Sequence, residues 1–267
     1  FSNFVMFILF VVGVIFSYNY FDSSSQQINT ETIFTGETIK VANWNLQIFG
    51  DAKASNEYLM NKYVEIINDY DIIFVQEIRD IDGSSFDKLC LMLPEYNCKI
   101  SSRAGRSSSK EQYGLFYKQN LILSEYVDYN EQDFNDLFER PPIEATFQFN
   151  DNQIIFYNIH VKPDDAFNEI GRLENLLQNT DEKNKILLGD LNADCSYYDT
   201  PPSHFLNWIF LIKDDEDTTS SSTNCAYDRI IVTQNVNTLI SNYGIYTEGI
   251  DKEVSDHYLV WVEIKSN

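Results

Sequence analysis

Polar side chains of a chemically useful kind follow an apolar run late in the chain. The run 186–189 ends in glycine, and Asp190, Asn192 and Asp194 come next at a spacing of two. Carboxylate and amide oxygens of this kind bind divalent cations and orient water. Asp, Asn and Gly are also what a turn after a strand requires. This segment alone therefore fits a turn as well as a site.

The same arrangement recurs at other apolar runs. Asn45, Glu77 and His160 each come directly after a short run rich in β-branched or aromatic residues, and Asp256 and His257 open the last such run. If the last strand is antiparallel to its neighbours, its start meets their ends. We therefore expect these polar side chains to lie together along one rim of the fold.

The pattern of apolar residues predicts an α+β layered sandwich. The predicted strands are 38–44, 71–76, 113–118, 144–149, 153–159, 185–189, 228–233 and 257–264. Helical spacing predicts helices at about 55–68, 83–93 and 164–178, the last with Asp164 as its N-cap and Phe167 on its apolar stripe.

The composition fits one large domain. The chain has 267 residues, of which 43% are hydrophobic, and no Gly/Ser-rich or Pro-rich linker follows residue 40. The net charge of −22 argues against a non-specific nucleic-acid binder. A bound metal ion and a few local arginines can still supply a positive field for a polyanionic substrate.

The N-terminal part is apolar. Residues 4–16 form an uninterrupted apolar run of 13, shorter than the roughly 20 residues of a membrane span. We interpret residues 1–24 as a secretory signal and 25–267 as a single catalytic domain. A short membrane anchor or a buried strand is the alternative for the first segment.

Four cysteines are present, and none forms a C-x-x-C pair of the kind that binds zinc. An even number of cysteines after a signal indicates two disulfides. Their spacing leaves all three pairings open.

Several longer motifs resemble those of the deoxyribonuclease I family, in order, over about residues 38–265. They are "WNLQIFG", "VQEIRD", "GRSSSKEQY", "IHVKPDDAFNEI", "GDLNADCSY", "DTTSSSTNCAYDRI" and "SDHYLVWVE". The resemblance implies a four-layered α/β sandwich with two packed, mostly antiparallel β-sheets flanked by helices. Other enzymes of this endonuclease/exonuclease/phosphatase fold include abasic-site endonucleases, inositol-polyphosphate phosphatases and sphingomyelinases.

The resemblance also assigns roles. Glu111 is expected to pair with His160 and Asp228 with His257, one pair activating water and the other serving the departing 3′-oxygen; which pair does which stays open. Asp190 and Asn192 would orient the water and the phosphate. The expected catalytic residues are Glu111, His160, Asp190, Asp228 and His257.

Glu77, with Asn45 and Asp256, is the expected Mg²⁺ site, because these hard oxygen ligands suit magnesium or calcium. A structural Ca²⁺ is implied at a Ser/Thr-rich loop. Its expected ligands are Asp217, Thr219, Ser221 and Thr223. The other calcium loop of the family is poorly matched, since Asp136 and Phe138 remain but Pro141 replaces a ligand glutamate.

The resemblance makes Arg79, Arg140 and Asn192 the expected substrate-binding residues, with the two arginines on the DNA backbone or minor groove. It pairs Cys195 with Cys225. Cys90 and Cys98 have no counterpart, and either pair locally or remain buried thiols.

Three features depart from the family. Gln47 replaces a phosphate-contacting arginine, and Ser109 replaces a tyrosine that packs in the minor groove. The stretch "YNCKISSRAG" lacks the exposed apolar residues with which vertebrate members bind actin, so no actin binding is expected. His204 is expected to be a surface or packing residue.

The sequence therefore predicts a secreted, divalent-metal-dependent endonuclease that cuts double-stranded DNA to 5′-phosphate ends. We expect a monomer that lies outside the cell or in the lumen of the secretory or endolysosomal pathway, with no stable membrane insertion after signal removal. The alternatives are a phosphodiesterase of the same fold with another substrate, and a non-catalytic binding protein.

Overall fold

The computed structural model describes residues 37–266 except 108, 151, 179–182 and 199–202. The segment 1–24, interpreted above as a signal, lies outside the described residues. Within the described part of the chain, no helix is both long enough and apolar enough to cross a membrane.

Twelve strands form two six-stranded sheets in the described residues. The first has the order β11-β12-β1-β2-β4-β3, with β1 Thr38–Phe49, β2 Ile72–Ile78, β3 Tyr96–Ile100, β4 Gln112–Lys118, β11 Ile240–Tyr246 and β12 Leu259–Lys265. The second has the order β5-β6-β7-β8-β10-β9, with β5 Ile122–Asp128, β6 Ile143–Phe149, β7 Asn152–His160, β8 Lys185–Asp190, β9 Ile209–Phe210 and β10 Asp228–Val232. Each sheet contains one parallel pair, β1–β2 or β7–β8, and is otherwise antiparallel.

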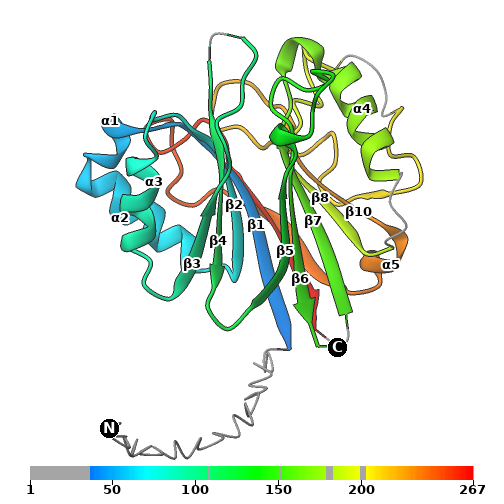
Figure 1. Cartoon of the computed structure of the whole chain (residues 1–267), viewed down its shortest axis with the longest axis horizontal. Helices are drawn as coiled ribbons and strands as arrows, with labels where there is room; N and C mark the ends of the chain where they lie inside the picture. The colour runs from blue at the N-terminus through cyan, green and yellow to red at the C-terminus, as the bar shows by residue number, and fades with distance from the viewer. Residues whose placement is uncertain (1–36, 108, 151, 179–182, 199–202, 267) are drawn as a thin grey trace, which may run out of the picture. The chain divides into compact units, whose positions relative to one another are not determined.

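Helices cover the outer faces of both sheets (Figure 1). The helices are α1 Asp51–Ala54, α2 Glu57–Ile67, α3 Ser84–Leu91, α4 Ala166–Gln178 and α5 Gln234–Asn237, with 3₁₀ turns at Tyr129–Glu131 and Pro163–Asp165. Three buried apolar clusters lie between the layers: one between the sheets, one under α1–α3 and one under α4. These clusters confirm the four-layered sandwich.

Strand β1 shows why the sheets form at the centre of the molecule. Ile39 and Val41 pack between the sheets, whereas Ala42, Trp44 and Leu46 pack under the helices. Since successive side chains of a strand point to opposite faces, a strand buried on both faces reads as a continuous apolar run.

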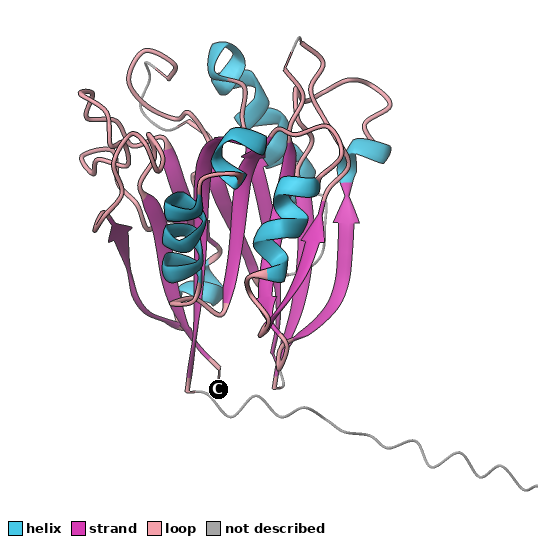
Figure 2. Ribbon diagram, turned by 90° about the vertical axis from the view of Figure 1, so that its left-hand side faces the viewer, coloured by secondary structure: helices cyan, strands magenta, loops and turns pink. Residues whose placement is uncertain are grey.

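The pairing of the strands brings the polar strand ends to one rim. Strand β12 is antiparallel to β1, so the start of β12 meets the end of β1. In the other sheet, Asp190 pairs with His160 of β7 and with Asp228 of β10. Figure 2 shows the loops gathered at this end of the strands.

The eight predicted strands correspond to β1, β2, β4, β6, β7, β8, β10 and β12, and the three predicted helices to α2, α3 and α4. Strands β3, β5, β9 and β11 were missed because they are the edge strands of the two sheets and their side chains are incompletely buried. Asp164 is not the N-cap of α4: Pro163 starts a 3₁₀ turn that contains Asp164, and the α-helix begins at Ala166. Phe167 is 45% exposed and lies against the rings of Tyr198 and His204.

Candidate active site

Unusual backbone marks the rim where the strands end. Gln47, Ile48, Glu77 and Asn192 have positive φ angles of 48°, 52°, 62° and 47°. Residues other than glycine adopt this left-handed conformation rarely, and such residues cluster at functional sites. These four residues lie at or just beyond the ends of β1, β2 and β8, the strands that carry candidate residues.

His160, the last residue of β7, is held by Glu111. Its Nδ1 lies 2.5 Å from Glu111 Oε1, and both side chains are buried. Glu111 sits at the base of a loop, where its backbone pairs with Ala104 in both directions. Burial opposes protonation of His160 and so does the charge of Arg140, but Glu111 and Asp190 outweigh them and raise the pKa of His160.

His257 is held in the same way by Asp228. Its Nδ1 lies 2.7 Å from Asp228 Oδ2, and Asp228 is fully buried in β10. Burial lowers the pKa of His257, but the carboxylates of Asp228 and Asp190 outweigh this effect and raise the pKa. Burial also raises the pKa of Asp228.

Asp190 lies between the two imidazoles. Its Oδ2 is 3.4 Å from His160 Nε2 and 3.6 Å from His257 Nε2. Asn45 Nδ2 donates a hydrogen bond to the same oxygen at 3.1 Å. The structure therefore brings the two histidines, each with its carboxylate, around one carboxylate oxygen, as the rim arrangement predicts.

Glu77 and Asn45 lie side by side at the ends of β2 and β1. Asn45 Nδ2 donates to Glu77 Oε1 at 3.2 Å, and the backbone N–H of Ile48 donates to Glu77 Oε2 at 2.9 Å. Burial opposes ionisation of Glu77, but the charges of His160 and Arg79 and these hydrogen bonds lower its pKa to about 2. Glu77, Glu111 and His160 each bring one side-chain oxygen or nitrogen within 4.8 Å of those of the other two.

The remaining expected metal ligand, Asp256, is more open. Its side chain is 40% exposed, and Oδ1 lies 3.9 Å from His257 Nε2. Lys53 is close enough to Asp256 and Glu77 for both carboxylates to raise its pKa, although burial dominates and lowers the pKa to about 8.

Arg79 lies over the two glutamates. Its guanidinium is 2.9 Å from Glu77 and 3.6 Å from Glu111, and it donates to Ser109 Oγ at 2.6 Å. The side chain keeps 28% of its surface exposed. Its charge thus serves the carboxylates of the rim and still reaches solvent.

Arg140 departs from the expected solvent-facing contact. The residue is 6% exposed. It donates to the carbonyl oxygens of His160 and Val161 at 3.0 and 3.2 Å, and its Nε lies 3.3 Å from Glu111. A motif shows that an arginine is present but not which way it points, and here the charge is directed at the buried carboxylate.

Asn192 is buried directly beyond Asp190. Its backbone N–H donates to Asp190 Oδ1 at 3.1 Å, and Nδ2 donates to the carbonyl oxygen of Val161 at 2.9 Å. Asn192 thus turns the chain away from β8 at the rim. Asp194 instead accepts from the N–H of Ala226 at 2.7 Å and so holds the segment before β10.

The expected calcium loop gathers its oxygens by internal hydrogen bonds. Asp217 Oδ1 accepts from the N–H and hydroxyl of Thr219 at 3.0 and 2.9 Å, and Ser221 and Thr223 hydrogen bond each other. The Thr219 hydroxyl also donates to the carbonyl oxygen of Thr223 at 2.7 Å. Thr219 bridges to His257, so this loop adjoins the rim.

The cysteines form two disulfides. Cys195 pairs with Cys225 across a separation of 30 residues, which confirms the pairing implied by the resemblance. Cys90 pairs with Cys98 across a separation of 8, which settles the alternative left open for these two.

Sequence patterns missed the side chains that join β1 to the segment before β12. Trp44 Nε1 donates to the carbonyl oxygen of His257 at 2.9 Å, and Ser255 Oγ donates to that of Asn45 at 2.6 Å. Lys53 Nζ donates to the carbonyl oxygens of Leu46 and Val254, both at 2.8 Å.

Gln76 was also missed, although a glutamine in an apolar strand is an available signal. It is fully buried in β2 and crosses to the other sheet, where Nε2 donates to the carbonyl oxygen of Ile159 at 2.6 Å. Tyr197 and Tyr227 form a ring contact at 5.5 Å, and Tyr227 lies 6.2 Å from His257.

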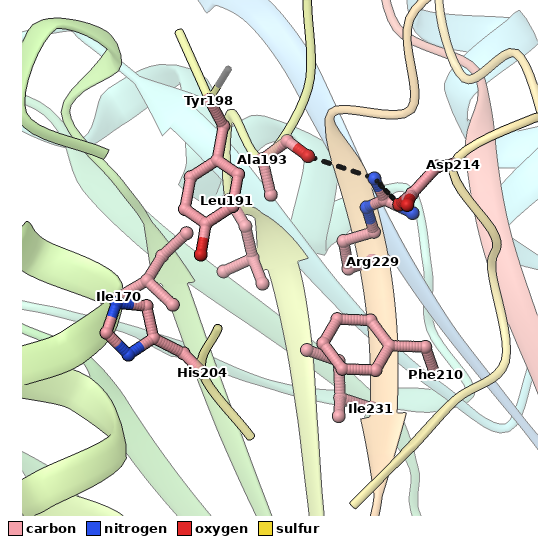
Figure 3. A pocket seen from close by; sticks show the side chains of 9 residues that line it. All are labelled: Ile170, Leu191, Ala193, Tyr198, His204, Phe210, Asp214, Arg229 and Ile231. Atoms are coloured by element: carbon pink, nitrogen blue, oxygen red, sulfur yellow. Dashed lines mark hydrogen bonds and ion pairs between the residues drawn. The ribbon is translucent and has the colours of Figure 1, made fainter. Parts of the chain in front are cut away.

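His204 lies away from this rim. Figure 3 shows it beside Ile170 at a small cavity that also contacts Leu191 and Ile231. Its Nδ1 lies 3.2 Å from Glu174 of α4 and its ring lies 4.9 Å from that of Phe167. His204 therefore packs a loop against α4, as expected.

The chain resembles known proteins over most of its length. Residues 42–257 match the model of the Endonuclease/Exonuclease/phosphatase family. It is 34% identical to Deoxyribonuclease-1 of Bos taurus over 221 residues, covering 74% of this chain and 78% of that protein. It is 31% identical to Deoxyribonuclease gamma of Homo sapiens over 278 residues, covering 88% and 89%.

A solved structure of an endonuclease/exonuclease/phosphatase family protein from Leptotrichia buccalis shares the fold. The TM-score is 0.65 at 16% identity, with 85% of this chain and 99% of that chain covered.

Proposed function

Because the chain belongs to the Endonuclease/Exonuclease/phosphatase family, we propose that it is a secreted, divalent-metal-dependent endonuclease that hydrolyses double-stranded DNA to 5′-phosphate ends. One observation carries the proposal: the imidazoles of His160 and His257, each held at Nδ1 by a carboxylate, direct Nε2 at the same oxygen of Asp190. The similarity to proteins named deoxyribonucleases supports DNA as the substrate.

The two histidines divide the proton transfers. Hydrolysis of a phosphodiester requires one group that takes a proton from the attacking water and another that gives a proton to the leaving oxygen. Both Nε2 atoms lie within 3.6 Å of Asp190, so a phosphate beside Asp190 is within reach of both. Asp190 and Asn192 orient the water and the phosphate.

The residues at the end of β1 and β2 fit a hard divalent cation. Glu77 is held ionised, and Asn45 lies beside it, with Oδ1 accepting from the N–H of Gln47 and Nδ2 donating to Glu77. Asp256, 3.9 Å from His257 Nε2, would add a carboxylate from the start of the last strand. These three residues would hold Mg²⁺, which when bound stabilises the negative charge that develops on the phosphate. Arg140 supports the site through Glu111, and Arg79 contributes its exposed edge to the substrate.

The loop of Asp217 fits a structural Ca²⁺ in its donor chemistry, because it brings carboxylate and hydroxyl oxygens together. Its ligands would be Asp217, Thr219, Ser221 and Thr223. Loss of Ca²⁺ should lower the melting temperature of the wild-type protein and not that of Asp217→Ala.

Two disulfides support the secretory assignment, since such bonds persist in oxidising compartments. We also propose a monomer that does not bind actin. In Tyr96–Ile100 the one aromatic residue, Tyr96, is buried and donates to the carbonyl oxygens of Ile67 and Tyr70. The exposed residues of this strand are the polar Asn97 and Lys99. Gel filtration and actin co-sedimentation test these two statements.

Nicking of supercoiled plasmid by the purified protein tests the function. We expect relaxed circles with Mg²⁺ plus Ca²⁺, no relaxation with EDTA, and 5′-phosphates at the nicks. His204→Ala is the matched control for His160→Ala, because both remove a histidine but only His160 lies at the rim. Nicking that survives full chelation, or none with any divalent ion, would overturn the proposal.

A DNA substrate that stays intact while another phosphodiester is hydrolysed would favour the alternative of a different substrate for the same fold. Equal activity of wild type and His160→Ala would overturn the role of His160 in proton transfer.

A further inference from the structure

Ile48 is exposed at a place where the strand pattern would bury it. Trp44 and Leu46 of β1 both belong to the apolar cluster under α1–α3. A period of two puts residue 48 on the same face. Instead, Phe49 joins that cluster and Ile48 is 58% exposed.

A bulge in β1 causes this exposure. The register between β1 and β2 shifts between Asn45 and Phe49, and Gln47 and Ile48 are both left-handed, with φ angles of 48° and 52°. From Asn45 to Phe49 strand β1 advances four residues while β2 advances two, from Gln76 to Ile78, so β1 carries two extra residues. Extra residues bend a strand and redirect side chains, which is why bulges are frequent beside active sites. A β-branched residue is a steric outlier in this conformation, and asparagine or glycine would adopt it at lower cost.

The bulge is fixed to the candidate metal ligands. The N–H of Gln47 donates to Asn45 Oδ1 at 2.9 Å, and the N–H of Ile48 donates to Glu77 Oε2 at 2.9 Å. On the other side, the carbonyl oxygen of Phe49 accepts from the N–H of Arg79 at 2.7 Å. The exposed side chain of Ile48 therefore lies at the edge of the site, because the backbone N–H of the same residue donates to Glu77.

We propose that Ile48 is a substrate-contacting residue whose side chain packs on the deoxyribose and base of a nucleotide next to the scissile phosphate. The inference rests on the proposed function, which makes DNA the substrate. The sugar and the base are the apolar surfaces that a nucleotide offers. Contact with them does not depend on charge, so it adds affinity that salt does not screen on a chain with a net charge of −22.

Ile48→Asn tests the inference, because asparagine tolerates the left-handed backbone and removes the apolar surface. We expect KM for duplex DNA to rise about tenfold with kcat nearly unchanged, as for a contact made equally in ground and transition state. The ratio of the KM of Ile48→Asn to that of the wild type should stay constant as the salt concentration rises. The melting temperature should stay equal or increase, since the strain is relieved.

Two further variants sharpen the result. Ile48→Val keeps most of the apolar surface and should keep most of the affinity. Ile122→Asn is the control: Ile122 is 42% exposed at the start of β5, at the strand end opposite the rim, and has no positive φ angle. It should leave KM unchanged and should not raise the melting temperature.

An active wild type whose KM is unchanged by Ile48→Asn would overturn the inference alone. A loss of kcat at constant KM would also overturn it, since Ile48 would then act through Glu77. A wild type that leaves DNA intact would instead overturn the proposed function, and this inference with it. If Ile48→Asn fails to fold, Ile48→Thr carries the same expected rise in KM, because threonine keeps the branching but loses apolar surface.

Discussion

The two histidine–carboxylate pairs have similar geometry but stand on different supports. The Nδ1–carboxylate distances are 2.5 Å for His160 and 2.7 Å for His257. Glu111 lies at the base of a loop, where it pairs with Ala104, whereas Asp228 is the first residue of β10 and pairs with Asp190 of β8. The first carboxylate is positioned by side chains around a loop, and the second by the hydrogen bonds of a sheet.

Their electrostatic surroundings also differ. Glu111 faces Arg140 at 3.3 Å and Arg79 at 3.6 Å in addition to its histidine. Among the described residues, the cation in contact with Asp228 is His257. The neighbouring Asp190 carboxylate disfavours the charged form of Asp228. Glu111 therefore stays paired when its histidine is removed, and Asp228 does not. The charge of Glu111 is thus balanced without His160, whereas the charge of Asp228 depends on His257.

The largest expected effect treats the two pairs alike. His160→Ala and His257→Ala should each lower kcat by roughly 10²-fold or more, because each removes a group that transfers a proton. Steady-state kinetics of plasmid nicking measure this, with His204→Ala as the control. If either variant keeps a kcat close to that of the wild type, that histidine does not transfer a proton in the reaction.

Stability should separate the two pairs. His257→Ala leaves a buried carboxylate without its cation, and breaking a buried ion pair in this way costs about 3–5 kcal/mol. His160→Ala should cost less, because Glu111 keeps Arg140. Urea denaturation of both variants measures the difference.

Neutralising the orphaned carboxylate supplies the control. Adding Asp228→Asn to His257→Ala should recover much of the lost stability, since the buried charge is removed together with its partner. Equal losses in the two single variants, with no recovery in the double variant, would show that the two supports are equivalent.

The sequence predicted the elements that carry these pairs because their strands are buried on both faces. β7 and β8 read as apolar runs that end at His160 and Asp190, so the strand ends were visible. The edge strands β5 and β11 are exposed and alternate weakly, and no such signal was present.

The residue types of the site could be predicted from the sequence, but the backbone conformation and the orientation of the side chains could not. Nothing in the letters of Gln47 and Ile48 indicates a left-handed backbone, since no glycine marks the bulge. The burial of Arg140 was equally hidden, because it depends on contacts with Glu111 and with carbonyl oxygens distant in sequence. Geometry of this kind arises from tertiary packing, which a local pattern does not encode.

The loop support of Glu111 should be the weaker of the two. Arg106 ties this loop to the next by donating to the carbonyl oxygen of Phe138 at 2.6 Å and to Asp133 at 2.7 Å. Arg106→Gln should lower kcat severalfold by loosening the loop and should lower the melting temperature by about 2–4 °C, as expected for a loss of about 1 kcal/mol.

Arg172→Gln is the matched control for this change. Arg172 is a similarly exposed arginine that donates to a carbonyl oxygen, that of Leu137, and to a carboxylate, Asp165. It does not touch the loop of Glu111, so its loss should leave kcat unchanged. A larger effect on kcat from Arg172→Gln than from Arg106→Gln would contradict the loop support.

The smallest expected effect is a dependence of this loop support on pH. Asp133 accepts from the N–H groups of Leu137 and Phe138 at 2.9 and 3.0 Å and from Arg106. Burial raises its pKa, but these hydrogen bonds and the arginine outweigh burial and hold the pKa below its usual value of 3.8. A lowered pKa in the folded state means that the contribution to stability is complete above pH 3.8 and is lost as pH falls through the folded pKa.

The difference in melting temperature between wild type and Asp133→Asn isolates this contribution, because every other carboxyl group titrates in both proteins. We expect a constant difference from pH 7 to about pH 4 that narrows at lower pH, where Asp133 of the wild type becomes protonated and its ion pair with Arg106 is lost. A difference that persists unchanged to about pH 2 would mean that Asp133 acts through packing and not through its charge. In that case the loop of Glu111 would be held as independently of charge as the strand of Asp228, and this distinction between the two supports would fail.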